Sequence, residues 1–443
     1  MALTWCFLES SLGWRGLPEA VGGVFVSGEG VEYDVAAIEV LEGREAVRKR
    51  PGMWIGSVGE RGVLHMVWEV VGRAVNQSPP GRGGTLDVTL TRDGGVRVSD
   101  EGPGDVFETT GNTGNPGLET LLTSLHAGPD PGDRYTATVG HPRVGLCVVN
   151  ALSSRLRAEA RRDGVLRAQE YARGVAVAPP ATVGPASGSG TTIAFWPDTE
   201  IFETTRCSFA VLAERLRQVA FLNPGLSITV TDERPAGEAR AVRFRYPGGV
   251  RDFVAALHAQ AGALLHPDVI GCEREDPRMA GAMEVAFLWS GSREERIRSF
   301  ANSVETRQGG THVDGFRDGV AAAVTAYARR RGLLTAADPD LDVARIGEGL
   351  TAVVSVKLDR PEFLGATVGL LGNTAVRACV GEAVQECLGA WFEERPERAA
   401  EIVAQLVRGP HEDRTAANSP ALPRRKAALK SRGIRLLALI GRR

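Results

Sequence analysis

The chain has 443 residues, which is too long for one hydrophobic core and long enough for two ordinary domains. Its formal net charge is −2 and 24% of its residues are charged, so the overall charge is that of a soluble globular protein and does not point to nucleic-acid binding. The six cysteines are far apart and form no CxxC pair, which argues against a disulfide framework or a zinc site and suits a reducing cytoplasm. No apolar run reaches the roughly 20 residues of a membrane span, so we expect no membrane association.

The two ends differ from the rest of the chain. The start, MALTWCFLESSLGWRG, has neither a basic region nor a clean cleavage site, and we interpret residues 1–32 as an N-terminal extension rather than a signal peptide. The last twenty residues contain eight basic residues and no acidic one. The tail at 411–443 is therefore either a solvated segment or an arm that binds phosphates, for example those of DNA.

Hydrophobic periodicity predicts a helix over 62–75 after a shorter helix that Pro51-Gly52 ends. Its apolar residues recur at helical spacing, and a second stripe carries His65, Glu69 and Arg73 at i, i+4 and i+8. The stretch 85–100 alternates as a hairpin around a DGG turn.

The remaining elements are expected in this order. A helix over 115–128 is closed by Gly128, a loop covers 129–143, and another helix spans 144–156. Strands follow at 155–162, 165–173 and 190–197, then a helix at 208–225 and a strand at 227–233. Composition shifts near 245–249, where we expect a domain boundary; beyond it, long helices are predicted around 311–331 and 375–408.

The helix at 62–75 carries the first candidate for chemistry. A carboxylate such as Glu69, held by His65 one turn earlier, can orient and deprotonate a water molecule aimed at a phosphate. The same spacing also occurs in ordinary structural pairs on helix surfaces, so by itself it leaves both interpretations open.

Two glycine-containing turns supply the other candidates. In VSDEGPG, Asp100 could accept a hydrogen bond from an exocyclic amine such as adenine N6, while Gly102 and Gly104 let the backbone approach the ring. In SGSGTT, Thr191 could bond the base through water. The alternatives are an ordinary Asp-Gly turn and a plain turn that leads into a strand.

In order along the chain, AVRKRPGMWIG, HMVWEVV, SDEGPG, SGTTIAFWP, GGTHVDGF and GEGLTAVVSVKLDRPEF resemble bacterial DNA gyrase B and its topoisomerase IV relative. The resemblance runs from about Tyr33 to about Leu429 and implies an α+β fold. A GHKL (Bergerat) ATPase α/β sandwich with a dimerisation arm would occupy 33–245, and an α/β transducer domain 246–410. The acidic EGDSA-type motif of the DNA-cleavage (TOPRIM) domain is absent, so any DNA cleavage would come from another protein.

The resemblance also implies roles for particular residues. It makes ATP the cofactor, Glu69 the general base and His65 the residue that orients it. Asp100 and Thr191 would read adenine. Tyr33 and Ile38 would belong to the arm through which family members dimerise. Tyr135 would be a lid tyrosine, and Arg162 would lie at the pocket rim used by aminocoumarin inhibitors.

The sequence departs from the family on the phosphate side of this pocket. VVDNAIDE in the family is VVGRAVNQ here, so Arg73 replaces the asparagine that holds magnesium. Arginine has donors only and cannot bind a cation, which puts Mg²⁺ in doubt. Gly72, Asn76 and Gln77 replace three acids, and Pro103 replaces an arginine. An Arg73–Glu69 ion pair would in addition tie up the general base.

The lid and the transducer loop depart further. The lid reads YTATVGHPRVG, in which Thr136 replaces a phosphate-binding lysine. Val139, Pro142 and Arg143 also break its pattern, whereas Gly140 and Gly145 survive and could still present N–H groups to oxygens. In PEFLGATVGLLGN, Ala366 and Val368 stand where the family has the glutamine and the catalytic lysine of its QTK loop.

We therefore expect a gyrase B-like protein that binds ATP weakly or not at all and hydrolyses it slowly if ever. One alternative is a non-catalytic partner that pairs with genuine gyrase B as a heterodimer, or with itself, and meets gyrase A only indirectly. Another is a decoy that binds aminocoumarin-type inhibitors through Asp100, Thr191 and Arg162. A decayed paralogue without function is a third.

Overall fold

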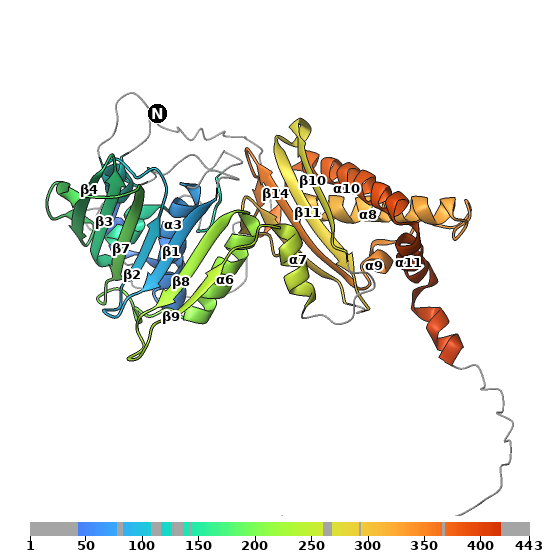
Figure 1. Cartoon of the computed structure of the whole chain (residues 1–443), viewed down its shortest axis with the longest axis horizontal. Helices are drawn as coiled ribbons and strands as arrows, with labels where there is room; N and C mark the ends of the chain where they lie inside the picture. The colour runs from blue at the N-terminus through green and yellow to red at the C-terminus, as the bar shows by residue number, and fades with distance from the viewer. Residues whose placement is uncertain are drawn as a thin grey trace, which may run out of the picture. The chain divides into compact units, whose positions relative to one another are not determined.

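The computed structural model (Figure 1) describes residues 43–77, 83–107, 117–125, 127, 136–140, 144–259, 268–291, 294–365 and 368–417. Several predicted features lie outside these residues: the arm with Tyr33 and Ile38, the lid residues Tyr135, Pro142 and Arg143, Ala366, and residues 418–443 of the basic tail.

Nine of the described strands form one sheet, here called the first sheet. Its order is β5-β4-β3-β7-β2-β1-β8-β9, with β6 on β4. The strands are β1 (Gly84–Leu90), β2 (Val96–Asp100), β3 (Ser153–Arg162), β4 (Val165–Ala172), β5 (Val175–Ala176), β6 (Ala181–Pro185), β7 (Gly190–Pro197), β8 (Leu226–Asp232) and β9 (Arg240–Phe244). β1 and β2 form the predicted antiparallel hairpin, whereas β1 and β8 are parallel. β2 is also paired with β7, so the turns at Asp100 and Gly190 lie side by side.

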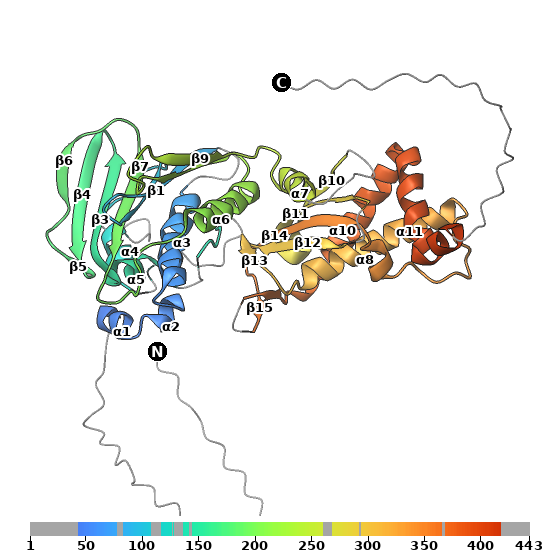
Figure 2. The same cartoon turned by 90° about the horizontal axis from the view of Figure 1, so that it is seen from below.

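Helices pack on this sheet or on one another (Figure 2). They are α1 (Gly43–Lys49), α2 (Gly52–Ile55), α3 (Glu60–Asn76), α4 (Leu118–Thr123), α5 (Leu146–Ala151) and α6 (Phe209–Leu222). The apolar stripe of α3, which includes Val67 and Val71, is fully buried against strand residues such as Val88 and Ile193. Burial of each such side chain contributes roughly 1.5–3 kcal/mol, which fixes the face that α3 turns away from the core.

A second sheet follows, with order β10-β11-β14-β12-β13. Its elements are α7 (Val250–His258), β10 (Ile270–Asp276), a 3₁₀ turn η2 (Pro277–Met279), β11 (Gly281–Trp289), β12 (Arg296–Ala301), β13 (Val304–Glu305), α8 (Thr311–Arg330), α9 (Val343–Ile346), β14 (Leu350–Leu358), β15 (Phe363–Leu364), β16 (Leu370–Leu371), α10 (Thr374–Glu394) and α11 (Pro396–Ala417).

Both faces of the second sheet are covered. On β11, Val285 and Phe287 pack in the core that contains α8 and α10, whereas Ala286 and Leu288 pack with α7. Successive strand residues point to opposite faces, so β11 is buried on both sides and its sequence reads as a continuous apolar run. The predicted α+β fold with two α/β sheets is confirmed. No helix in the described parts of the chain is both long enough and apolar enough to cross a membrane.

Two predicted helix ends in the first half are wrong. α4 ends at Thr123, because Ser124 is extended (φ −108°, ψ 129°), and Gly128 lies outside the described residues. Serine and threonine compete with the helix for backbone hydrogen bonds, and here Thr123 Oγ1 donates to Glu119 O (2.7 Å). The helix expected over 144–156 ends at Ala151, and Ser153 begins β3 by pairing with Pro197 of β7.

Two differences occur in the second half of the predicted elements. The single helix expected at 375–408 is two helices, α10 and α11, separated at Arg395 (φ −132°, ψ 62°). Pro396 excludes the α conformation from the residue before it, which accounts for the break. β9 was not predicted, because its alternation is weak and its side chains are only half-buried or exposed.

The GGTHVDGF segment opens α8 and buries His312 completely. His312 Nε2 lies 3.0 Å from Thr306 Oγ1, and burial lowers the pKa of His312 to about 4. The histidine is therefore neutral in the folded protein, while the unfolded chain takes up a proton near its ordinary pKa of about 6.5.

We predict that the free energy of unfolding falls as pH decreases from about 6.5 to about 4, with about 3 kcal/mol of the loss due to His312. Urea denaturation at a series of pH values checks this. The His312→Asn variant, which cannot titrate, should show a flatter pH dependence over that window. Equal slopes for the two proteins would contradict the prediction.

Candidate functional site

The partly buried stripe of α3 brings His65 and Glu69 together, as their i, i+4 spacing predicts. His65 Nε2 lies 3.2 Å from Glu69 Oε1, and the backbone N–H of Gly145 donates to Glu69 Oε2 (3.1 Å). The Glu69 side chain is 9% exposed. Its carboxylate thus lies against an imidazole with one oxygen and accepts the N–H of the residue before α5 with the other.

Gly140 lies directly against this carboxylate. A Cβ atom on Gly140 would lie 2.2 Å from Glu69 Oε1, which is far closer than any real contact. Any larger residue at position 140 would displace the Glu69 carboxylate. The segment 136–140 is also attached to α3 by Asn76, whose side chain accepts from Ala137 N (2.8 Å) and donates to Ala137 O (3.1 Å).

Asp100 and Thr191 meet at the ends of β2 and β7, and both are almost fully buried. Asp100 Oδ1 accepts from Gly102 N (2.9 Å) and Thr191 N (3.3 Å). Gly104 has φ 77°, and a Cβ there would lie 2.2 Å from Arg161 O. The glycine turn after Asp100 is thus packed closely against the backbone of β3.

The second oxygen of Asp100 is taken by Arg73. Arg73 Nη1 lies 2.5 Å from Asp100 Oδ2, and Arg73 Nη2 forms a further ion pair with Asp105 Oδ2. The Arg73 side chain is 11% exposed and that of Asp100 is 1% exposed. The predicted Arg73–Glu69 ion pair is wrong, because the guanidinium turns to β2 and the turn after it.

Asp105 is a site residue that our sequence interpretation missed. Thr191 Oγ1 accepts from its backbone N–H (3.1 Å). Burial raises the pKa of Asp105 and the neighbouring Asp100 adds to the rise, while Arg73 opposes it. Two features of the sequence could have indicated it. Asp105 is the third acid of the stretch SDEGPGD, and Arg73 lies on the stripe of α3 that also carries His65 and Glu69.

Arg162 lies at the edge of this group of residues. Its Nη1 donates to Gly104 O (3.2 Å), and its side chain is 49% exposed. The neighbouring Arg161 donates to Asp100 O (3.3 Å) from its Nη2. Arg162 is thus an exposed candidate site residue.

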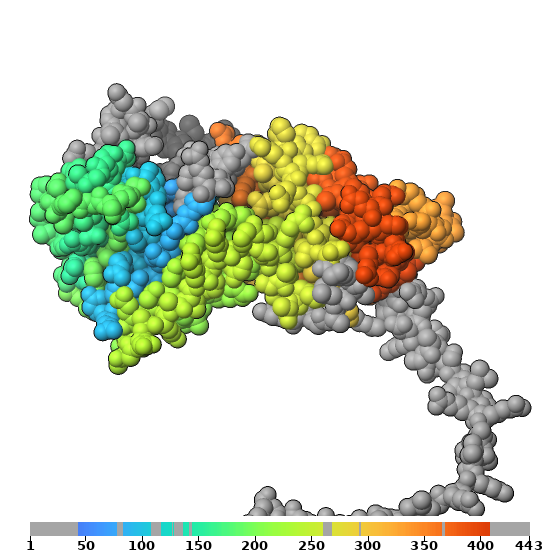
Figure 3. Space-filling model, viewed as in Figure 1, coloured from blue at the N-terminus to red at the C-terminus, as the bar shows by residue number. Residues whose placement is uncertain are grey.

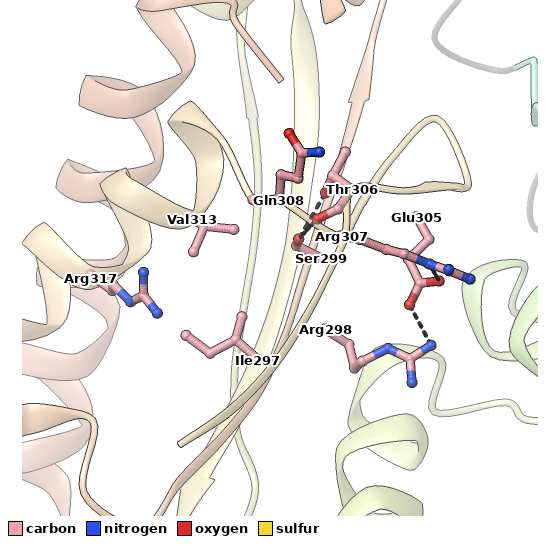
Figure 4. A pocket seen from close by; sticks show the side chains of 10 residues that line it. Ile297, Arg298, Ser299, Glu305, Thr306, Arg307, Gln308, Val313 and Arg317 are labelled. Atoms are coloured by element: carbon pink, nitrogen blue, oxygen red, sulfur yellow. Dashed lines mark hydrogen bonds and ion pairs between the residues drawn. The ribbon is translucent and has the colours of Figure 1, made fainter. Parts of the chain in front are cut away.

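A separate cavity of about 510 Å³ opens on the second sheet between β12, β13 and the start of α8 (Figure 4). Arg298 pairs with Glu305 (2.5 Å) on one side, and Arg317, on the other side, pairs with Glu295 (2.5 Å). Ser299 and Thr306 bond each other on its floor (2.8 Å). Arg298 and Arg317 are therefore both paired with carboxylates. None of the residues that line this cavity is a predicted site residue.

Several known proteins are similar to this chain in sequence and in fold. The sequence model of the DNA gyrase B family matches residues 249–420. The chain is 43% identical to the DNA gyrase B protein of Streptomyces coelicolor over 90% of its own length, and 38% identical to that of Mycobacterium tuberculosis over 91%. The 43K ATPase domain of Thermus thermophilus gyrase B, solved in complex with an aminocoumarin, is similar in structure with a TM-score of 0.71 and 32% identity. That match covers 84% of this chain and 96% of the Thermus domain.

The chain belongs to the DNA gyrase B family. It spans 60% of the Streptomyces protein and 63% of the Mycobacterium protein. The Francisella tularensis topoisomerase IV ATP-binding domain is a further structural neighbour, with a TM-score of 0.68 and 26% identity. In this gyrase B relative, Glu69 lies beside His65, and Asp100 lies beside Thr191. Arg73, one turn after Glu69 on α3, contacts Asp100.

We predict that Arg73→Met lowers the free energy of unfolding by about 3–5 kcal/mol, because two buried carboxylates lose their counter-ion. Asp105→Leu in the same chain should recover about 1–3 kcal/mol of that loss. Urea denaturation of the single and double variants measures the coupling. Arg97→Met is the matched control: its ion pair with Glu233 (3.4 Å) is exposed, so the change should be below about 1 kcal/mol. Additive effects of Arg73→Met and Asp105→Leu would show that the two side chains do not interact.

Proposed function

We propose that this protein is a gyrase B relative whose adenine-reading carboxylate is covered by its own arginine, so that ATP binds weakly or not at all and is hydrolysed more slowly still. The observation that carries the proposal is the Arg73–Asp100 ion pair. This chain spans about 60% of the length of its relatives, and we propose no activity on DNA for it.

Occupation of Asp100 works against adenine binding. Asp100 Oδ1 already accepts two backbone N–H groups, and Oδ2 accepts from Arg73. An adenine amine would have to displace a guanidinium that also bridges to Asp105. Breaking a buried ion pair on one side leaves an unpaired charge, which typically costs about 3–5 kcal/mol, and one neutral hydrogen bond returns only about 0.5–1.5 kcal/mol.

The phosphate side supports the same conclusion. The residues at the expected magnesium position do not fit that ion, because Arg73 offers donors only and its two Nη atoms already contact carboxylates. Thr136 and Val368 bring no cation where the family has lysines. Loss of one cation that stabilises phosphoryl transfer typically slows the reaction by about 10³–10⁵-fold, and here two lysines and a magnesium ligand are replaced together.

The residues that would prepare the attacking water are retained. The 3.2 Å contact between His65 and Glu69, and the N–H of Gly145 on the other carboxylate oxygen, support a Glu69 still held for general-base work. A positioned base gives no turnover without a bound and neutralised phosphate. The proposal is therefore a protein impaired in nucleotide binding first and in chemistry second.

Calorimetric titration of the folded chain with a non-hydrolysable ATP analogue, with and without magnesium, tests this proposal. We expect no magnesium-dependent binding by the wild-type protein. Arg73→Asn frees Asp100 and restores the family's magnesium ligand, so it should tighten binding by at least about tenfold, which corresponds to 1.4 kcal/mol.

Arg73→Lys is the matched control, because it keeps the positive charge beside Asp100 and should bind no better than wild type. Hydrolysis by Arg73→Asn should stay slow, since Thr136 and Val368 are unchanged. Magnesium-dependent binding by the wild-type chain would overturn the proposal and restore an ATPase interpretation.

A second candidate function is binding of aminocoumarin-type ligands, which the exposed rim position of Arg162 favours. The Thermus domain, which is similar in structure, was solved with such a ligand. Titration with an aminocoumarin should give binding that Arg162→Ala weakens and that ATP does not compete. Binding that is unchanged in Arg162→Ala would remove this candidate. Pairing with a gyrase B chain through the arm at 33–38 stays a prediction.

A further inference from the structure

Two cysteines meet where β10, at the edge of the second sheet, lies against α10. Cys272 on β10 and Cys387 on α10 are close enough for each thiol to shift the pKa of the other. Cys272 Sγ also lies 3.5 Å from Ala383 O, and Cys387 Sγ lies 3.4 Å from Gly271 O. Ala383 is one helical turn before Cys387, and Gly271 precedes Cys272. Each sulfur therefore reaches the backbone of the other element at the same place.

Two arginines lie beside this pair. Arg251 of α7 donates to Val269 O (3.3 Å) and to Gly271 O (3.1 Å), the carbonyl that Cys387 also contacts. Arg274 lies two residues beyond Cys272 and pairs with Glu386 (2.6 Å). Interaction with the Cys272 thiol lowers the pKa of Cys387, and Arg251 and Arg274 lower it further, whereas the same interaction raises the pKa of Cys272. A lowered pKa favours the thiolate, the nucleophilic form of cysteine, at Cys387.

The two sulfurs also differ in access. Cys272 is 5% exposed, whereas Cys387 is half-buried on a helix whose outer side forms part of the molecular surface (Figure 3, orange-red). A small reagent from solvent therefore meets Cys387 first. Cys272 lies behind it as the second thiol.

We propose that Cys272 and Cys387 are a redox-modification site that forms a reversible disulfide when the protein meets a peroxide. The thiolate of Cys387 attacks one peroxide oxygen, the O–O bond breaks, and the leaving hydroxide takes up a proton to become water. Cys387 is then a sulfenic acid. The Cys272 sulfur attacks the Cys387 sulfur, the S–O bond breaks, and the hydroxyl leaves as a second water with the Cys272 proton. Two thiols lose two electrons, and one peroxide is reduced to two waters.

The product joins β10, at the edge of the second sheet, to α10, which covers that sheet. A disulfide restricts the unfolded chain more than the folded one, so the oxidised protein should unfold at a higher temperature than the reduced protein. This modification does not depend on nucleotide binding, so it stands or falls separately from the proposed function.

The test treats the full-length, folded chain with hydrogen peroxide, blocks the remaining thiols with an alkylating reagent, and maps the peptides by mass spectrometry. We expect a Cys272–Cys387 cross-linked peptide pair, about 2 Da lighter than the two reduced peptides and released by dithiothreitol. In Cys272→Ala, peroxide should leave Cys387 as a sulfenic acid that a dimedone probe traps. In Cys387→Ser, Cys272 should stay reduced.

Two other buried thiols serve as internal controls. Burial raises the pKa of Cys207 to about 11 and also raises that of Cys379, so both should remain alkylatable after unfolding. Cys379→Ser should form the cross-link as wild type does. Circular dichroism confirms that each variant is folded. Recovery of Cys272 and Cys387 as free thiols after peroxide, or a cross-link between other cysteines, would overturn the proposal.

Discussion

The candidate site depends on one guanidinium placed between two carboxylates. Arg73 lies two helical turns after His65 and one after Glu69 on the same stripe of α3, and the buried opposite face of α3 directs that stripe at the ends of β2 and β7. From this position the Arg73 guanidinium contacts Asp100 and Asp105. Each contact occupies a carboxylate oxygen that could otherwise accept a hydrogen bond from a ligand. Arg73, which stands at the position where we expected a magnesium ligand, thus also occupies the carboxylate to which we assigned adenine recognition.

Such a buried triad is sensitive to the loss of any member. Two acids and one base buried together retain their stability only while all three are present, because removal of the arginine leaves like charges in a poorly solvated place. The raised pKa of Asp105, caused first by burial and then by Asp100, reflects that balance. Glu69, with His65 beside it and Gly140 packed against it, lies outside this triad. A change at Arg73 therefore alters the surroundings of Asp100 and Asp105 more directly than those of Glu69.

Much of the fold could be predicted because its signals are local. The apolar spacing of α3 and the DGG turn of the β1–β2 hairpin follow from periodicity and turn chemistry. The predicted ends of elements were wrong where tertiary contacts or a single residue determine them. Ser153 is strand because β7 pairs with it, and α10 stops at Arg395 because Pro396 follows. In the site, the positions of Glu69, His65, Asp100 and Thr191 were predictable from motifs, but the partner of Arg73 was not. Helical spacing made Glu69 its nearest acid along the chain, whereas Asp105 comes from another element and is visible only in three dimensions.

In our proposal, Arg73 blocks adenine from Asp100. The most direct test of this block is a crystal structure of the 443-residue chain grown with magnesium and a saturating non-hydrolysable ATP analogue. We predict that Arg73 still bridges Asp100 and Asp105 and that no adenine amine bonds to Asp100. An adenine bonded to the Asp100 carboxylate, with the Arg73 guanidinium turned away from it, would contradict this prediction and would make the arginine a movable gate in a working nucleotide site.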